Sequence, residues 1–259
     1  HLGMTNWGPP AEVFAEARTV ATRALELESE NAEAISILAL IKFQTEYDWA
    51  GAAGLFQQAM ARNSDSVIFN DSYAFYLTDT MQHQEAIRCA RHCQKKVPQP
   101  CYYQVRLGWT YLVARQYDEA IAQLRETQLS FPELAFADML LSWGYAMKGM
   151  PAQALSECAK AETKGVPSWH LRWIYAKAGQ EKEAGAGLEE LLKQNLADEL
   201  LSVLAFTALG EIDLAFEQLG KAYEKRLPYL VFLKALPQFD ALRSDPRYFG
   251  LLKKIGLDE

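Results

Sequence analysis

The chain has 259 residues, of which half are hydrophobic and 23% are charged. Its 26 basic and 33 acidic side chains give a formal net charge of −7 at pH 7. This composition is that of a globular protein and excludes a disordered or collagen-like chain. The acidic balance argues against a nucleic-acid partner, because affinity for nucleic acid rests largely on neutralising phosphates. No apolar run reaches the roughly 18 residues that a membrane span needs, and no secretory signal opens the chain. We therefore expect a cytoplasmic protein with no membrane contact.

The first predicted helix runs from Pro10 to about Glu28, and proline is well tolerated at a helix start. By its place in the repeat described below, it is the second helix of a pair whose first helix is missing or reduced to residues 1–4. It carries Val13, Phe14 and Val20 where the end of a helical array normally has a polar cap. We interpret the chain as a fragment of a larger protein that continues in the N-terminal direction. A short natural N-terminus capped by Trp7 is the alternative.

An alanine recurs along the chain at near-regular intervals, and each one opens an apolar helical pattern. The successive spacings are 35, 34, 34, 34, 30 and 31 residues. Seven residues after each alanine stands another residue that is small in most units. Two antiparallel helices with two tight turns need roughly 34 residues, and small residues let such helices pack closely. The recurring alanines are Ala17, Ala52, Ala86, Ala120, Ala154, Ala184 and Ala215.

Each of these alanines lies in the second helix of a pair. The first helix of the pair precedes it and has its own signature. Leu107-Gly108 is followed by Tyr111, and Leu141-Ser142 is followed by Tyr145. With the 34-residue period, this pattern resembles the tetratricopeptide repeat over nearly the whole chain. The resemblance implies an all-α, right-handed superhelical solenoid of helix-turn-helix repeats. The unit at 32–66 has one extra residue near Tyr47, and the units ending at Leu191 and Ala222 are shortened.

We expect residues 1–227 to form the repeat array, with a leading helix and about six helix pairs. Residues 228–259 are predicted to form a helical cap on the last repeat. Asp245 can cap a final helix that begins at Pro246, and Gly256 can close it.

The tail and the early segment Tyr47-Asp48-Trp49 also resemble the C-terminal tetratricopeptide regions of large bacterial regulators. The tail segments that carry this likeness are Leu230–Lys234, Pro237–Phe249 and Leu251–Leu257. Those proteins place a winged-helix, protein-kinase or nucleotidyl-cyclase domain ahead of the repeats. The family usually reads Asp-Pro-Arg-Phe where this chain has Leu236-Pro237-Gln238-Phe239. The likeness implies a regulatory interaction module, with an N-terminal effector domain of the same polypeptide as one possible partner.

The phase of the repeat places one set of side chains on the concave face lined by the first helices. This predicted groove is aromatic and apolar, with two polar members. Aromatic anchors commonly dominate binding energy, so we expect the groove to bind a protein or peptide segment. Its residues are Phe75, Tyr102, Val105, Arg106, Trp109, Phe136, Met139, Trp143, Trp169, His170 and Trp173.

Other interpretations of these groove residues remain open. The aromatic residues can be core that is buried by tight curvature. The apolar tail or a missing N-terminal domain can fill the groove in cis. A small apolar ligand can occupy it, which would make the chain a sensor module of a signalling or transcriptional regulator. A clamp for a terminal carboxylate is disfavoured, because only Arg106 and His170 are suitable in type and histidine is mostly neutral near pH 7.

The sequence carries no catalytic motif that we recognise. Carboxylate pairs such as Glu189-Glu190 fit solvated helix faces better than acid/base pairs, and we expect a non-catalytic chain without cofactors. Cys89 and Cys93 lie four residues apart with His92 between them, so a metal site is worth considering. A structural zinc needs four converging ligands, and Cys93 and Cys158 fall where a small buried residue is expected. We interpret the four cysteines, which include Cys101, as small hydrophobic residues in a reducing compartment and predict no metal.

Overall fold

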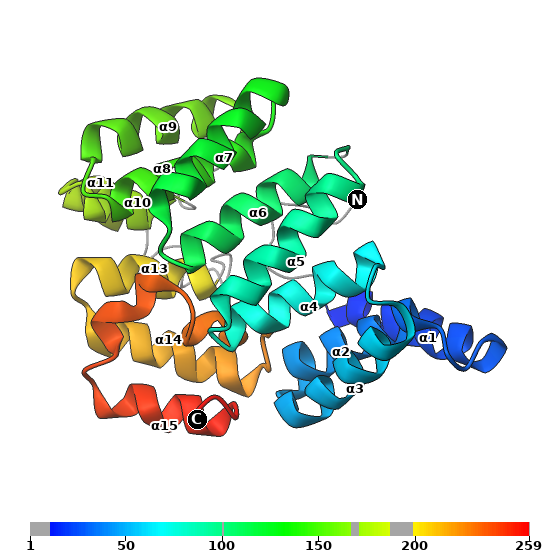
Figure 1. Ribbon diagram of the computed structural model, residues 1–259. Coiled ribbons are helices and arrows are strands. Elements are labelled where there is room, and N and C mark those ends of the chain that lie inside the picture. The colour runs from blue at the N-terminus through cyan, green and yellow to red at the C-terminus, as the bar shows by residue number, and fades with distance from the viewer. Residues whose placement is uncertain (1–10, 100, 167–170, 187–198, 259) are drawn as a thin grey trace. The chain divides into compact units, whose positions relative to one another are not determined.

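The computed structural model describes residues 11–99, 101–166, 171–186 and 199–258 (Figure 1). Every regular element in these ranges is a helix, so the predicted all-α class is confirmed. The α-helices are α1 (Ala11–Leu27), α2 (Ala32–Glu46), α3 (Trp49–Asn63), α4 (Val67–Asp79), α5 (His83–Lys96), α6 (Tyr102–Val113), α7 (Tyr117–Ser130), α8 (Ala135–Met147), α9 (Pro151–Thr163), α10 (Arg172–Lys177), α11 (Glu181–Gly185), α13 (Glu199–Leu209), α14 (Ile212–Glu224) and α15 (Pro246–Lys254). Two 3₁₀-helices, η2 (Pro228–Leu233) and η3 (Pro237–Leu242), lie between α14 and α15.

Within the described ranges, α1 is followed by six helix pairs: α2–α3, α4–α5, α6–α7, α8–α9, α10–α11 and α13–α14. The two helices of a pair pack against each other, as α2 does on α3 and α8 does on α9. First helices of successive pairs also pack together, as α2 does on α4 and α10 does on α13. This is the paired-helix arrangement that the 34-residue period predicts.

The repeat alanines lie where the helices of a pair cross. Six of them, from Ala52 to Ala215, are completely buried, and Ala17 of the leading helix is partly exposed. Gly108 shows why a small residue is needed at such a crossing. A Cβ atom on Gly108 would come within 2.6 Å of the side chain of Leu124, so α6 and α7 are in close contact there.

Three helix starts are fixed by side-chain caps that accept a backbone N–H. Asn31 accepts from Ala34 at the start of α2, Asp48 from Gly51 at the start of α3, and Ser66 from Phe69 at the start of α4. Tyr47 ends α2 in the left-handed region, with φ of 57°. That conformation accommodates the extra residue that the sequence places in this unit.

The described residues group into two compact units, each made from separate stretches of the chain. One unit comprises residues 1–103, 226–235 and 251–259, and the other comprises 104–225 and 236–250. Each unit therefore draws on the predicted 1–227 array and on the predicted 228–259 cap. Neither unit corresponds to one of those two segments.

In the first unit, residues near the end of the chain pack on the first helix pair. Helix η2 packs on α2. The Tyr47 hydroxyl donates to the Leu227 carbonyl at 3.3 Å, and the Trp49 indole N–H donates to the Ile255 carbonyl at 2.6 Å. Trp49 and Ile255 are both buried. The Tyr47-Asp48-Trp49 segment thus anchors the tail in this unit.

In the second unit, η3 packs on α13, the first helix of the last pair. Asp245 precedes the final helix, and its carboxylate accepts the backbone N–H of Arg247 at 2.9 Å. The Arg247 side chain pairs with Asp213 at 2.8 Å and lies over the ring of Phe216 of α14, with its guanidinium carbon 4.3 Å from the ring centre.

Candidate interaction surface on the first helices

Three tryptophans form a contiguous row across successive first helices. Trp109 of α6 and Trp143 of α8 have ring centres 5.9 Å apart, and Trp143 and Trp173 of α10 are also 5.9 Å apart. All three side chains are buried. They occupy the same position of their repeats, so the repeat itself places them in register. We call these three residues the aromatic row.

The other predicted groove residues divide into buried and partly exposed side chains. Val105 and Met139 are buried. Four more are partly exposed: Phe75, Tyr102, Arg106 and Phe136. Trp169 and His170 lie outside the described residues.

Two of the partly exposed members, Arg106 and Phe136, share a helix face with the aromatic row. Arg106 precedes Trp109 by three residues, and Phe136 precedes Trp143 by seven, which are spacings that place side chains on one face of a helix. In the first unit, the Tyr102 hydroxyl hydrogen-bonds to the Asp71 carboxylate of α4 at 2.9 Å.

A segment from the tail lies against the aromatic row. Leu236, Pro237 and Gln238 line a small cavity together with residues of α6 and α8, the latter being Trp109, Leu112, Val113, Trp143 and Met147. Phe239 and Leu242 of η3 are also buried. The segment that begins at Leu236 therefore covers part of the face that the sequence predicts as a binding groove.

An ion pair fixes this segment at its edge. Arg115 follows α6 and donates from both Nη atoms to the Asp240 carboxylate, with N–O distances of 2.6 and 2.7 Å. Two parallel hydrogen bonds of this kind are stronger and more directional than a single one. The Asp240 carboxylate raises the pKa of Arg115 by hydrogen bonding to it. Arg243 also contacts Asp240, at 2.8 Å.

Arg115 and Asp240 are not among the site residues that the sequence predicts. The two residues are 125 positions apart, and each is an ordinary surface residue by local pattern. The only available signal was the high apolar content of the tail, which raised the possibility that the tail fills the groove.

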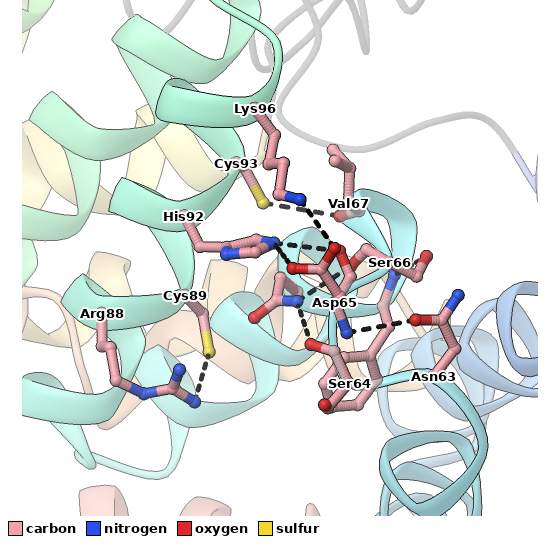
Figure 2. Close-up of polar contacts among 12 residues, drawn as sticks. Asn63, Ser64, Asp65, Ser66, Val67, Arg88, Cys89, His92, Cys93 and Lys96 are labelled. Carbon is pink, nitrogen blue, oxygen red and sulfur yellow. Dashed lines mark hydrogen bonds and ion pairs between the residues drawn. The ribbon is translucent and has the colours of Figure 1, made fainter.

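Two of the residues considered for a metal site, His92 and Cys93, instead contact the backbone between α3 and the start of α4 in the first unit (Figure 2). His92 Nε2 lies 3.0 Å from the Asp65 carbonyl oxygen, and Lys96 pairs with the Asp65 carboxylate at 2.6 Å. The Lys96 ammonium holds the pKa of Asp65 below its usual range. The Cys93 thiol donates to the Val67 carbonyl at 3.4 Å. These side chains tie α5 to the preceding turn.

Cys89, Cys93 and Cys158 are buried, and Cys101 is partly buried. Burial raises the pKa of Cys89 to about 11 and that of Cys158 to about 12. Such thiols remain protonated at neutral pH and are poor nucleophiles and metal ligands. No group of three or more His, Cys, Asp or Glu side chains that could hold a metal occurs in the part of the chain that the structure describes.

One fully buried carboxylate, that of Asp138, is paired with a basic side chain. Asp138 of α8 is inaccessible to solvent and contacts Lys164 at 2.5 Å. Gln128 of α7 donates to Asp138 at 2.5 Å and to Glu157 of α9 at 2.9 Å. This network joins three consecutive helices, so we interpret it as structural. None of the helices in the described ranges is both long and apolar enough to cross a bilayer.

No sequence-family model matches the chain, and no curated protein matches it. Among solved structures, PilW, described as a widely conserved type IV pilus biogenesis factor, has a TM-score of 0.59 and 19% identity. The match covers 74% of this chain and 91% of PilW. PilF of Pseudomonas aeruginosa has a TM-score of 0.55 and 15% identity, with 74% and 88% covered.

Both of these proteins contain tetratricopeptide repeats, so the predicted tetratricopeptide-repeat fold is confirmed. At these identities the likeness shows the fold alone. The resemblance of the tail to large bacterial regulators stays a prediction.

Proposed function

We propose that the chain is a non-catalytic scaffold that binds a segment of a partner protein on the face formed by α6, α8 and α10. The observation that carries this proposal is the aromatic row of Trp109, Trp143 and Trp173 on that face. Beside it, Phe136 and Arg106 remain partly accessible and supply one aromatic and one cationic contact. Large aromatic side chains and arginine are the residue types that most often dominate protein–protein binding energy.

The absence of catalysis is part of this proposal, and two observations support it. The buried carboxylate of Asp138 is held in a structural network by Lys164 and Gln128. The buried thiols of Cys89 and Cys158 have raised pKa values and are not activated as nucleophiles. We also propose that the chain is the cytoplasmic regulatory part of a larger bacterial protein, on the basis of the sequence resemblance of its tail.

A small apolar ligand is the second candidate occupant. The cavity beside Trp109 and Trp143 has apolar walls and one carboxamide, from Gln238. The space is about that of a single water molecule, whereas small-molecule sites usually measure several hundred Å³. The size of this cavity favours a partner segment over a bound small molecule.

A photo-crosslinking amino acid at position 136 tests the proposed function. Phe136 lies on the proposed binding face, whereas Leu129 of α7 is 81% exposed and belongs to a second helix. In native cell extract, the probe at position 136 should capture one discrete protein that the probe at position 129 does not. An added Arg106→Glu substitution should weaken the capture. Equal capture at both positions, or capture at 129 alone, would place the binding surface elsewhere.

A further inference from the structure

The tail segment Leu236–Leu242 has the properties of a bound peptide. Leu236 is extended, with φ of −68° and ψ of 124°, and the next six residues form the single 3₁₀-helix η3. A short 3₁₀-helix has poor hydrogen-bond geometry and little stability of its own. Its order therefore comes from the helices on which it packs. Phe239 and Leu242 are the buried anchors, and Asp240 is exposed at the edge.

The surface that holds this segment combines an apolar floor with one charged edge. The floor is formed by Trp109 and Trp143 with their neighbours on α6 and α8. The edge is Arg115, which holds the Asp240 carboxylate with two hydrogen bonds of 2.6 and 2.7 Å. The floor borders Pro237 and Arg115 binds Asp240, while the intervening Phe239 is buried as η3 packs on α13. A proline, an aromatic residue and an acidic residue therefore follow one another in fixed order along this surface.

The chain's own segment does not satisfy this surface completely. Gln238 is 7% exposed, and its Oε1 atom finds no hydrogen-bond donor among the residues that the structure describes. The same side chain borders the small cavity beside Trp109 and Trp143. Burying an unpaired carbonyl oxygen is unfavourable. A segment with an apolar residue at this position would avoid that penalty and could fill the cavity.

We propose that the floor and Arg115 form a peptide-recognition site that segment 236–242 occupies in cis. The occupant in trans would be a partner segment of the form apolar–Pro–apolar–aromatic–acidic. This inference rests on the proposed scaffold function and names the class of its partner. The partner competes with the tail, and its apolar third residue gives it the better fit.

Peptide binding to charge variants of the full chain tests the proposal. The probe is a fluorescently labelled peptide of residues 234–243 that carries Gln238→Leu, followed by fluorescence anisotropy. In the Asp240→Lys chain, Arg115 repels the tail segment, so the peptide should bind at least ten-fold more tightly than to the wild-type chain. In the Arg115→Glu chain, a peptide that also carries Asp240→Lys should bind, and the aspartate peptide should bind at least ten-fold more weakly.

The double variant Arg115→Glu/Asp240→Lys is the matched control. There the tail segment pairs with position 115 again, so the lysine peptide should bind only as weakly as the aspartate peptide binds the wild-type chain. Circular dichroism must show unchanged helix content in every variant, and Asp240→Asn is the milder substitute if a charge reversal prevents folding. The proposal would be overturned if neither peptide bound the folded single variants. It would also be overturned if a single variant bound the two peptides equally well.

The crosslinking test separates this inference from the proposed function. If a partner is captured at position 136 with equal yield in the wild-type and Asp240→Lys chains, then the partner does not compete with the tail and this inference is wrong. The scaffold function itself would then stand. If no protein is captured at position 136 in either chain, both the scaffold function and the competition with the tail are contradicted.

Discussion

Trp49 and Ile255 are joined by a hydrogen bond of 2.6 Å although 206 positions separate them in the sequence. The indole N–H of Trp49 supplies the donor, and the Ile255 carbonyl near the end of α15 accepts it. A Cβ atom on the adjacent Gly256 would lie 3.1 Å from the Trp49 ring, so the two segments are closely packed. Through this contact, the start of α3 in the first helix pair holds the tail.

Replacing Trp49 with phenylalanine should destabilise the protein by about 1–3 kcal/mol beyond the loss of ring volume, because a buried carbonyl loses its donor. Urea unfolding followed by circular dichroism measures the change. Trp173→Phe is the matched control, since Trp173 is also a buried tryptophan and loses the same ring volume. If both variants lose the same free energy of unfolding, the hydrogen bond does not contribute as described.

Two glycines in helices should respond to alanine in opposite directions. At Gly108 the new methyl group would clash with buried Leu124, and we expect a loss of about 1–3 kcal/mol. At Gly220 in α14 a Cβ atom would meet nothing within 4 Å, so alanine should stabilise the helix by about 0.5–1 kcal/mol. Thermal unfolding of both variants checks the pair. A stabilising effect at Gly108 would contradict the close helix crossing.

Arg172 stands where other repeats have a small residue. It lies twelve residues before a repeat alanine, as do Gly108 and Ser142. The residue is 7% exposed, its Nε has no acceptor among the residues that the structure describes, and its Nη1 donates to the Ala184 carbonyl at 3.4 Å. Burial lowers the pKa of Arg172.

We expect Arg172→Ser to stabilise the protein by about 1–3 kcal/mol, because it removes a poorly compensated buried charge. The free energy of unfolding in urea is the measurement. Lys182→Ser, at an exposed position of α11, should change it by less than about 0.5 kcal/mol. A destabilised Arg172→Ser chain would show that the arginine fills space that serine cannot.

One of the four cysteines should react far faster than the others. Cys101 is partly accessible, whereas Cys89, Cys93 and Cys158 are buried. Burial raises the pKa of Cys89 to about 11 and that of Cys158 to about 12, so at pH 8 almost none of either thiol is ionised. A thiol-reactive disulfide reagent should label one cysteine quickly in the native protein and four after unfolding. Cys101→Ser should abolish the fast phase; rapid labelling of that variant would mean that a buried thiol is exposed.

The helix pairs could be predicted from the sequence because their determinants are local and periodic. An alanine at each crossing, a small residue seven positions later and an aromatic residue in the first helix repeat with nearly constant spacing. The same periodicity placed Trp109, Trp143 and Trp173 in one row, which the structure contains. Local capping signals also indicated the start of α15 at Pro246.

The contacts of the tail could not be predicted in this way. Arg115 with Asp240 and Trp49 with Ile255 are pairs of ordinary residues whose partners are more than a hundred positions away. Nothing in local spacing distinguishes Asp240 from other exposed carboxylates. The 3₁₀ conformation of η2 and η3 was missed for a related reason, since such short helices take their form from the surface they cover. Whether the groove residues bind a partner stays a prediction.

The composition of the first unit has a consequence for how the protein is made. This unit includes residues 226–235 and 251–259 as well as the first helix pairs. During synthesis, α2 and α3 emerge long before Ile255, so the hydrogen bond between Trp49 and Ile255 must wait until the tail has left the ribosome. In a simple linear array each repeat can settle on the one before it as it appears. Here a chain that stops before Ile255 would leave the Trp49 indole without the acceptor that it has in the folded unit.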